Sequence, residues 1–135
     1  MKYLFDTNAL CEPTRKRPDE EFLRWFSELD GEPPYTTTIS LAEVWQGWFR
    51  LPAKHPRRRE LRFWAERLPD AFRLLKFDAA AAQAWGELTA SGDPLPVRDS
   101  IIAAIALSRS LTVVTQDTGP FERAGCKVLS PWSGA

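Results

Sequence analysis

Short apolar and β-branched runs alternate with amphipathic helical patterns along most of this chain. The runs at 2–5, 35–39 and 112–115 favour strands, whereas segments such as 20–29 and 58–68 carry apolar residues at helical spacing. Strands separated by helices are joined by crossovers, which place them parallel in one sheet with helices on both faces. The sequence therefore predicts an α/β fold with a mainly parallel central sheet of about five short strands flanked by helices.

The length of 135 residues corresponds to one domain, and 44% hydrophobic residues are enough for a core. No stretch approaches the roughly 20 uncharged apolar residues of a membrane span. Asp6 comes too early for a signal peptide. Two cysteines and one histidine exclude a disulfide framework and a multi-histidine site. We expect a cytoplasmic protein with reduced thiols and no membrane association.

Four acids stand at the predicted junctions between elements. Asp6 directly follows the first strand, and Asp117 follows the strand that ends at residue 115. Glu43 and Asp99 each lie in the first turn of a predicted helix. Sites in parallel sheets lie at the carboxyl ends of the strands, where four carboxylates would repel one another unless a cation joined them. Oxygen ligands without histidine or thiolate favour Mg²⁺ or Mn²⁺.

Structural roles are open for three of these acids. Asp6 could cap the following helix, and Asp117 could belong to an Asx turn. Glu43 fits a capping box that begins at Ser40. Asp99 is harder to explain in this way because it heads an apolar helical face, where a carboxylate needs a compensating partner. Its position near a helix N-terminus would also stabilise the anion.

Positive charge is concentrated in the middle of a chain whose net charge is zero. Residues 50–76 carry nine basic and three acidic side chains. Such a patch could contact a phosphate backbone or an acidic partner, or it could be a solvated helix face. Aromatic residues in two predicted helices could likewise form an exposed apolar groove for a partner or simply fill the core. They are Phe22, Trp25, Phe26, Trp45, Trp48 and Phe49.

Five motifs together resemble the PIN-domain ribonucleases, specifically the toxin halves of VapBC-type toxin–antitoxin pairs. They occur in the family's order and cover the chain end to end, as a single domain over residues 1–135. Each motif alone is weak, but five in order are a specific signal. The motifs are Tyr3-Leu4-Phe5-Asp6-Thr7-Asn8, Ile39-Ser40-Leu41-Ala42-Glu43-Val44, Arg98-Asp99-Ser100-Ile101-Ile102-Ala103-Ala104, Val113-Val114-Thr115-Gln116-Asp117 and Val128-Leu129-Ser130-Pro131-Trp132.

The resemblance implies a set of site residues. The family's metal-binding acids map onto Asp6, Glu43, Asp99 and Asp117, and its supporting polar positions map onto Asn8 and Thr115. The fourth motif departs from the family pattern. Relatives commonly read T-R-N-x-x-D-F there, with asparagine first and the acid three residues later. This chain has Asp117 at the first position and Pro120 at the later one, and we assign the role to Asp117.

The resemblance also implies a function. We expect a Mg²⁺- or Mn²⁺-dependent endoribonuclease that cleaves RNA with a metal-activated water, inhibited by a cognate antitoxin and assembled as a homodimer. One alternative is a catalytically silent PIN-like module that binds RNA or protein. Another is a phosphotransfer domain with Asp6 as its nucleophile, but haloacid-dehalogenase-like sites of that kind need an acid two residues later, where this chain has Asn8.

Overall fold

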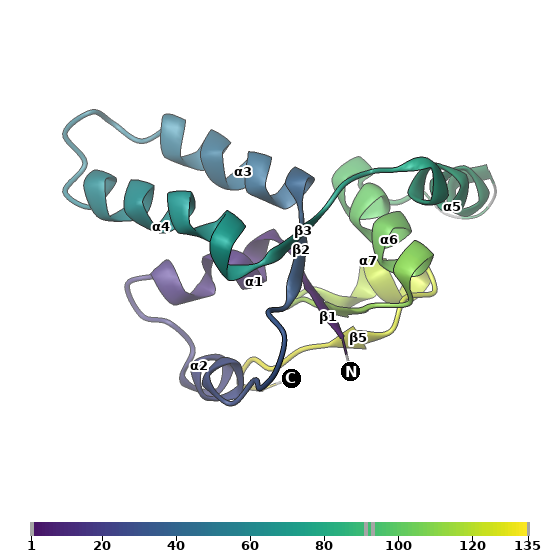
Figure 1. Ribbon diagram of the computed structural model, residues 1–135, viewed down its shortest axis with the longest axis horizontal. Helices are drawn as coiled ribbons and strands as arrows, with labels where there is room; N and C mark the ends of the chain where they lie inside the picture. The colour runs from purple at the N-terminus through teal and green to yellow at the C-terminus, as the bar shows by residue number, and fades with distance from the viewer. Residues whose placement is uncertain (1, 91, 93, 135) are drawn as a thin grey trace.

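Five parallel strands form the centre of the computed structural model, which describes residues 2–90, 92 and 94–134 (Figure 1). Their order in the sheet is β3-β2-β1-β4-β5, so β1 is central and its two neighbours come from distant parts of the chain. The predicted α/β class and mainly parallel sheet are confirmed. The strands are β1 (Tyr3–Phe5), β2 (Tyr35–Thr37), β3 (Arg73–Leu75), β4 (Thr112–Val114) and β5 (Val128–Leu129).

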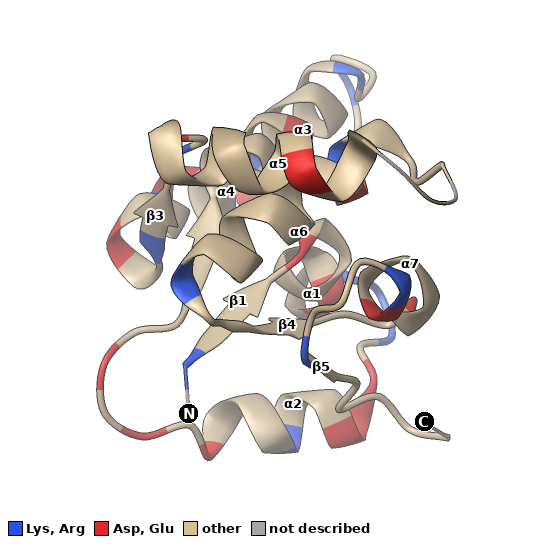
Figure 2. Ribbon diagram, turned by 90° about the vertical axis from the view of Figure 1, so that its right-hand side faces the viewer, with Lys and Arg blue, Asp and Glu red and all other residues tan. Residues whose placement is uncertain are grey.

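Helices connect the strands and cover both faces of the sheet. Figure 1 shows α1, α2, α3 and α4 on one side of the sheet and α5, α6 and α7 on the other. Helix α2 lies at the bottom, apart from the other helices, in both Figure 1 and Figure 2. The helices are α1 (Thr7–Cys11), the 3₁₀ turn η1 (Glu12–Thr14), α2 (Glu20–Ser27), α3 (Thr38–Phe49), α4 (Arg58–Ala71), α5 (Ala79–Ala90), α6 (Val97–Arg109) and α7 (Thr118–Arg123).

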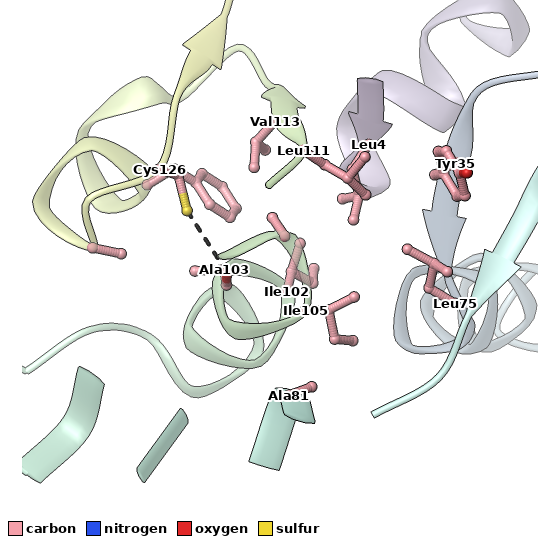
Figure 3. Close-up of a cluster of buried hydrophobic side chains, with 13 residues drawn as sticks. Leu4, Tyr35, Leu75, Ala81, Ile102, Ala103, Ile105, Leu111, Val113 and Cys126 are labelled. Atoms are coloured by element: carbon pink, nitrogen blue, oxygen red, sulfur yellow. Dashed lines mark hydrogen bonds between the residues drawn. The ribbon is translucent and has the colours of Figure 1, made fainter. Parts of the chain in front are cut away.

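Successive strand residues point into two different cores. Leu4 and Val113 belong to the cluster under α5 and α6, which Figure 3 shows in close-up. Phe5 and Val114 belong to the cluster on the opposite face, under α1, α2 and α4. Side chains of a strand alternate between faces, so a sheet buried on both sides needs continuous apolar runs. This requirement explains why the strand sequences are apolar at consecutive positions.

One predicted helix start is wrong. The capping box expected at Ser40 does not form, because α3 already begins at Thr38 and takes Thr37 as its N-cap. The Thr37 hydroxyl accepts a hydrogen bond from the Ser40 amide at 3.0 Å. The strand before it consequently ends at Thr37, two residues earlier than expected, and Glu43 lies in the second turn of α3, where its side chain does not cap the helix.

Most of the aromatic residues fill the core. Phe22 is fully buried, and Trp25 and Phe26 are partly buried against the same cluster. Phe49 is different, because 68% of its surface is exposed. Phe22 therefore fills the core, and the alternative that it lines an exposed groove for a partner is wrong. No helix of the described residues is long and apolar enough to cross a membrane.

A buried hydrogen bond ties the C-terminal segment to the first helices. The Trp132 indole N–H donates to Glu12 Oε1 at 2.6 Å, and both residues are almost completely buried. The other carboxylate oxygen of Glu12 accepts from the Asp19 amide at 3.1 Å. Since a buried carboxylate is costly without donors, the indole stabilises the acid as well as packing on Phe22 at 4.6 Å between ring centroids.

We expect Trp132→Phe to lower the free energy of unfolding by about 1.5–3 kcal/mol, because it removes one hydrogen bond from a buried carboxylate. Urea denaturation measures this loss. Trp85→Phe is the matched control, since the Trp85 indole donates to the neutral Ser100 hydroxyl at 3.0 Å. The free energy of unfolding of Trp85→Phe should fall by about 1 kcal/mol. Equal losses in the two variants would show that ring volume, rather than the Glu12 hydrogen bond, carries the stability.

Candidate active site

Asp6 lies at the carboxyl end of the central strand and caps α1. Its Oδ1 accepts a hydrogen bond from the Ala9 amide at 2.9 Å, and only 7% of the residue is exposed. Burial is the main reason that the pKa of Asp6 is raised from 3.8 to about 6, and the charges of Asp99 and Glu43 contribute to this rise. Hydrogen bonds from Thr115 and Ala9 oppose this rise. Asp6 is therefore both a structural cap and an anion held where a negative charge is unfavourable.

Asp99 and Asp117 approach the same region from the other half of the sheet. Asp99 lies in the first turn of α6 and is half-buried. Burial raises the pKa of Asp99, and the nearby charges of Asp117 and Glu43 raise it further. Asp117 is exposed after β4, and its carbonyl accepts from the buried Thr115 hydroxyl at 3.2 Å. The fold thus brings these acids into electrostatic contact at one edge of the sheet.

Glu43 reaches this edge from α3, where two side chains hold it. Its Oε1 accepts from the Thr7 hydroxyl at 2.9 Å, and its Oε2 pairs with Arg98 Nη1 at 3.1 Å. Neither Thr7 nor Arg98 was predicted as a site residue. The available signal was adjacency, since each is the chain neighbour of a predicted acid. Their contacts with Glu43 span 36 and 55 residues and depend on the fold.

The supporting polar positions have different environments. Thr115 is fully buried and contacts both Asp6 and Asp117. Its position is suited to orienting these two residues. Asn8 is exposed on α1. The chain's one histidine, His55, lies in the loop between α3 and α4, where its Nδ1 accepts from the Arg57 amide at 3.1 Å. An imidazole is therefore not among the groups that this edge of the sheet offers for proton transfer.

The donor set suits a hard divalent cation. Within the described ranges, no three His, Cys, Asp or Glu side chains are grouped closely enough to form a ready-made metal centre, and both oxygens of Glu43 are engaged by Thr7 and Arg98. Burial is the main cause of the raised pKa values of Asp6 and Asp99, and the neighbouring acids add to it, so a bound cation would stabilise both carboxylates. Carboxylate oxygens are the ligands that Mg²⁺ and Mn²⁺ prefer.

Comparison with known proteins identifies the family. The model of the PIN domain matches residues 3–126, which is most of the chain and includes all four predicted acids. This protein belongs to the PIN-domain family. The resemblance that the five sequence motifs indicate is therefore confirmed.

Full-length relatives extend this result. The chain is 40% identical over 136 residues to the plasmid stability protein StbB of Pseudomonas syringae pv. tomato, covering 96% of this chain and 97% of that protein. It is 35% identical over 140 residues to the VapC ribonuclease Y4jK of Sinorhizobium fredii, covering 98% and 99%. Among solved structures, FitAB bound to the IR36 DNA fragment matches with a TM-score of 0.88 and 32% identity, covering 96% of this chain and 95% of that one.

Asp6→Asn should make the protein more stable at pH 7 in metal-free buffer. The pKa of Asp6 is about 6 in the folded state, against its ordinary 3.8. Between these values the folded protein binds more protons than the unfolded chain, so this carboxyl makes folding less favourable as the pH rises through 6. Asparagine keeps the cap but carries no charge. The stability difference should grow to about 3 kcal/mol between pH 4 and pH 7.

Chemical denaturation of both proteins at pH 4, 5, 6 and 7 measures this difference. Subtracting the unfolding free energy of the unmodified protein from that of the variant at each pH cancels the contribution of other titrating groups. Asp30→Asn, on an exposed loop, is the control for losing one carboxylate. If Asp6→Asn is less stable than the unmodified protein at pH 7, the carboxylate of Asp6 stabilises the fold and the argument from charge repulsion is wrong.

Proposed function

We propose that this protein is a Mg²⁺- or Mn²⁺-dependent endoribonuclease and the toxin of a toxin–antitoxin pair. The observation that carries the proposal is the buried Asp6 at the end of the central strand, within electrostatic reach of Asp99 and Glu43. It occurs in a chain that is 35% identical, over almost its full length, to a VapC ribonuclease. RNA as substrate and the cytoplasm as location follow from the same proposal.

In this proposal Asp6, Glu43, Asp99 and Asp117 hold the divalent ion. A bound divalent cation would supply a nucleophile from water and neutralise the charge that develops on the phosphate in the transition state. The protein contributes the positions of the carboxylates. The Ala9 amide fixes Asp6, while Thr7 and Arg98 fix Glu43.

Arg98 has a second role in the proposed site, besides fixing Glu43. Its side chain is 59% exposed beside Glu43, so its guanidinium presents positive charge at the mouth of the acidic site. A phosphodiester approaching four carboxylates is repelled, and a cation at the entrance lowers that barrier. The same guanidinium could donate to a phosphate oxygen, because arginine carries five N–H donors and only one contact to Glu43 is present.

The catalytically silent alternative predicts different behaviour. A module that only binds would not need carboxylates whose burial and mutual repulsion are unfavourable, yet this fold keeps Asp6 almost completely buried. The phosphotransfer alternative needs an acid where the chain has the exposed Asn8. Metal-dependent turnover separates these alternatives.

Cleavage of RNA should require Mg²⁺ or Mn²⁺ and stop in excess EDTA. Asp99→Asn should lower the rate by several orders of magnitude and leave the protein folded, because it removes one of the charges that hold the ion. The variant should also gain less thermal stability from added Mn²⁺ than the unmodified protein does. Asp30→Asn is the control for both measurements, and RNA cleavage that persists in EDTA would exclude the mechanism.

The protein should be a homodimer and should bind the product of the adjacent reading frame, its antitoxin. Free nuclease activity is toxic, so the proposed function requires an inhibitor that covers the site. Apolar residues such as Phe77, Val97 and Leu107 remain exposed on the surface and are available for burial in a dimer. Analytical ultracentrifugation of the protein alone tests for the homodimer. The same measurement after mixing with the product of the adjacent reading frame tests for the antitoxin complex. A monomer that binds no such product and is harmless on overexpression would refute the toxin assignment.

A further inference from the structure

The hairpin of α3 and α4 ends in a strongly basic segment that the proposed chemistry does not use. Figure 1 shows the two helices side by side, projecting away from the sheet, and lysine and arginine segments mark their connecting loop at the top of Figure 2. We call residues 44–67 the arm. Its basic residues are Arg50, Lys54, Arg57, Arg58, Arg59, Arg62 and Arg67, and its acids are Glu60 and Glu66.

The positive charge of the arm is not neutralised by the protein. Glu60 pairs with Arg57 at 2.8 Å, and Glu66 pairs with Arg62 at 3.2 Å. No other basic residue of the arm has a carboxylate partner in the part of the chain that the structure describes. An excess of unpaired cations over one short segment attracts a polyanion.

Aromatic rings lie among these cations. The Arg58 guanidinium lies 3.9 Å from the centroid of Trp48, and Arg67 lies 4.1 Å from that of Phe63. Phe63 is 60% exposed and Phe49 is 68% exposed. Cationic surfaces with accessible aromatic rings are typical of proteins that bind single-stranded nucleic acids, in which phosphates contact the cations and bases stack on the rings. A duplex would hide its bases and gain nothing from the rings.

A groove connects the arm to the acidic site. It has a volume of about 190 Å³ and lies between α1, α3 and α4, and its lining includes Glu43 of the acidic site and Leu51 and Leu61 of the arm. Trp48 and Trp64 also line it. The distance from Glu43 to the start of the basic segment, at residue 50, is roughly 10 Å along a helix axis. An RNA strand bound at the arm can therefore continue to the carboxylates within a few nucleotides.

We propose that the arm binds single-stranded RNA and leads it along the groove to the acidic site. The binding part of this inference depends on the charge, the rings and the groove, and only the subsequent cleavage depends on the proposed function. Charge complementarity favours RNA over a second copy of this chain, whose arm would carry the same positive charge. Three cations on the arm, Arg50, Lys54 and Arg59, are exposed and suit the test.

The experiment compares two triple variants. The arm variant is Arg50→Ala, Lys54→Ala and Arg59→Ala. The control variant removes the same charge from exposed residues outside the arm, namely Lys2→Ala, Arg24→Ala and Lys127→Ala. Circular dichroism melts establish that both variants fold. Fluorescence anisotropy then measures binding of a labelled single-stranded RNA of about 20 nucleotides, longer than typical single-strand sites. These titrations contain EDTA and span several salt concentrations, and cleavage with Mg²⁺ is measured separately.

The arm variant should bind the RNA at least about tenfold more weakly than the control variant. The slope of log K against log salt should fall by about 2, because each phosphate that a side chain neutralises on a single strand adds about 0.7 to the slope. Equal affinities and slopes for the two variants would overturn the inference, even if both cleave RNA normally. If the arm variant binds RNA normally but binds the antitoxin encoded by the adjacent reading frame more weakly, the inference is also overturned and the arm is a protein interface. Arm-dependent RNA binding without cleavage would support the inference and refute the proposed function.

Discussion

Burial of the Asp6 carboxylate is the constraint around which this structure is arranged. The central strand ends in this acid, and the helix that follows begins on its side chain, so the position is fixed by backbone hydrogen bonding as well as by packing. Every element that contributes to the site then meets it at the same edge: α3 brings Glu43, α6 brings Asp99 and β4 leads into Thr115. The unfavourable electrostatics are tolerated because the cap and two apolar cores stabilise the fold elsewhere.

Hydrophobic patterning predicted most of the fold. Consecutive apolar residues such as Leu4 and Phe5 indicate a strand buried on both faces, and the alternation with helices indicates a parallel sheet. Connectivity then places the acids that follow the strands at one edge, so Asp6 and Asp117 could be predicted as neighbours of one site. The predicted start of α3 was wrong because Ser40 followed by Glu43 fits a capping box, whereas the structure uses Thr37, another residue suited to the N-cap.

Contacts between side chains of distant segments could not be predicted in this way. Thr7 and Arg98 meet at Glu43 only because α1, α3 and α6 converge, and Trp132 reaches Glu12 across 120 residues. The exposure of an aromatic residue also depends on tertiary packing, since Phe22 on α2 is buried whereas Phe49, the last residue of α3, is exposed. Assignment of the four acids as metal ligands stays a prediction.

The pairing of β1 with β4 has a consequence for how the protein is made. Tyr3 pairs with Thr112 and Phe5 with Val114, so the central pair of strands joins the start of the chain to residues near its end. Contacts of such long sequence separation form slowly and cannot form on a ribosome until β4 has been synthesised. Asp6 and Asp99 therefore stay apart until β4 has been synthesised, and a shorter nascent chain carries no assembled site. Synthesis interrupted before β4 therefore yields fragments in which the acids of the site are not assembled.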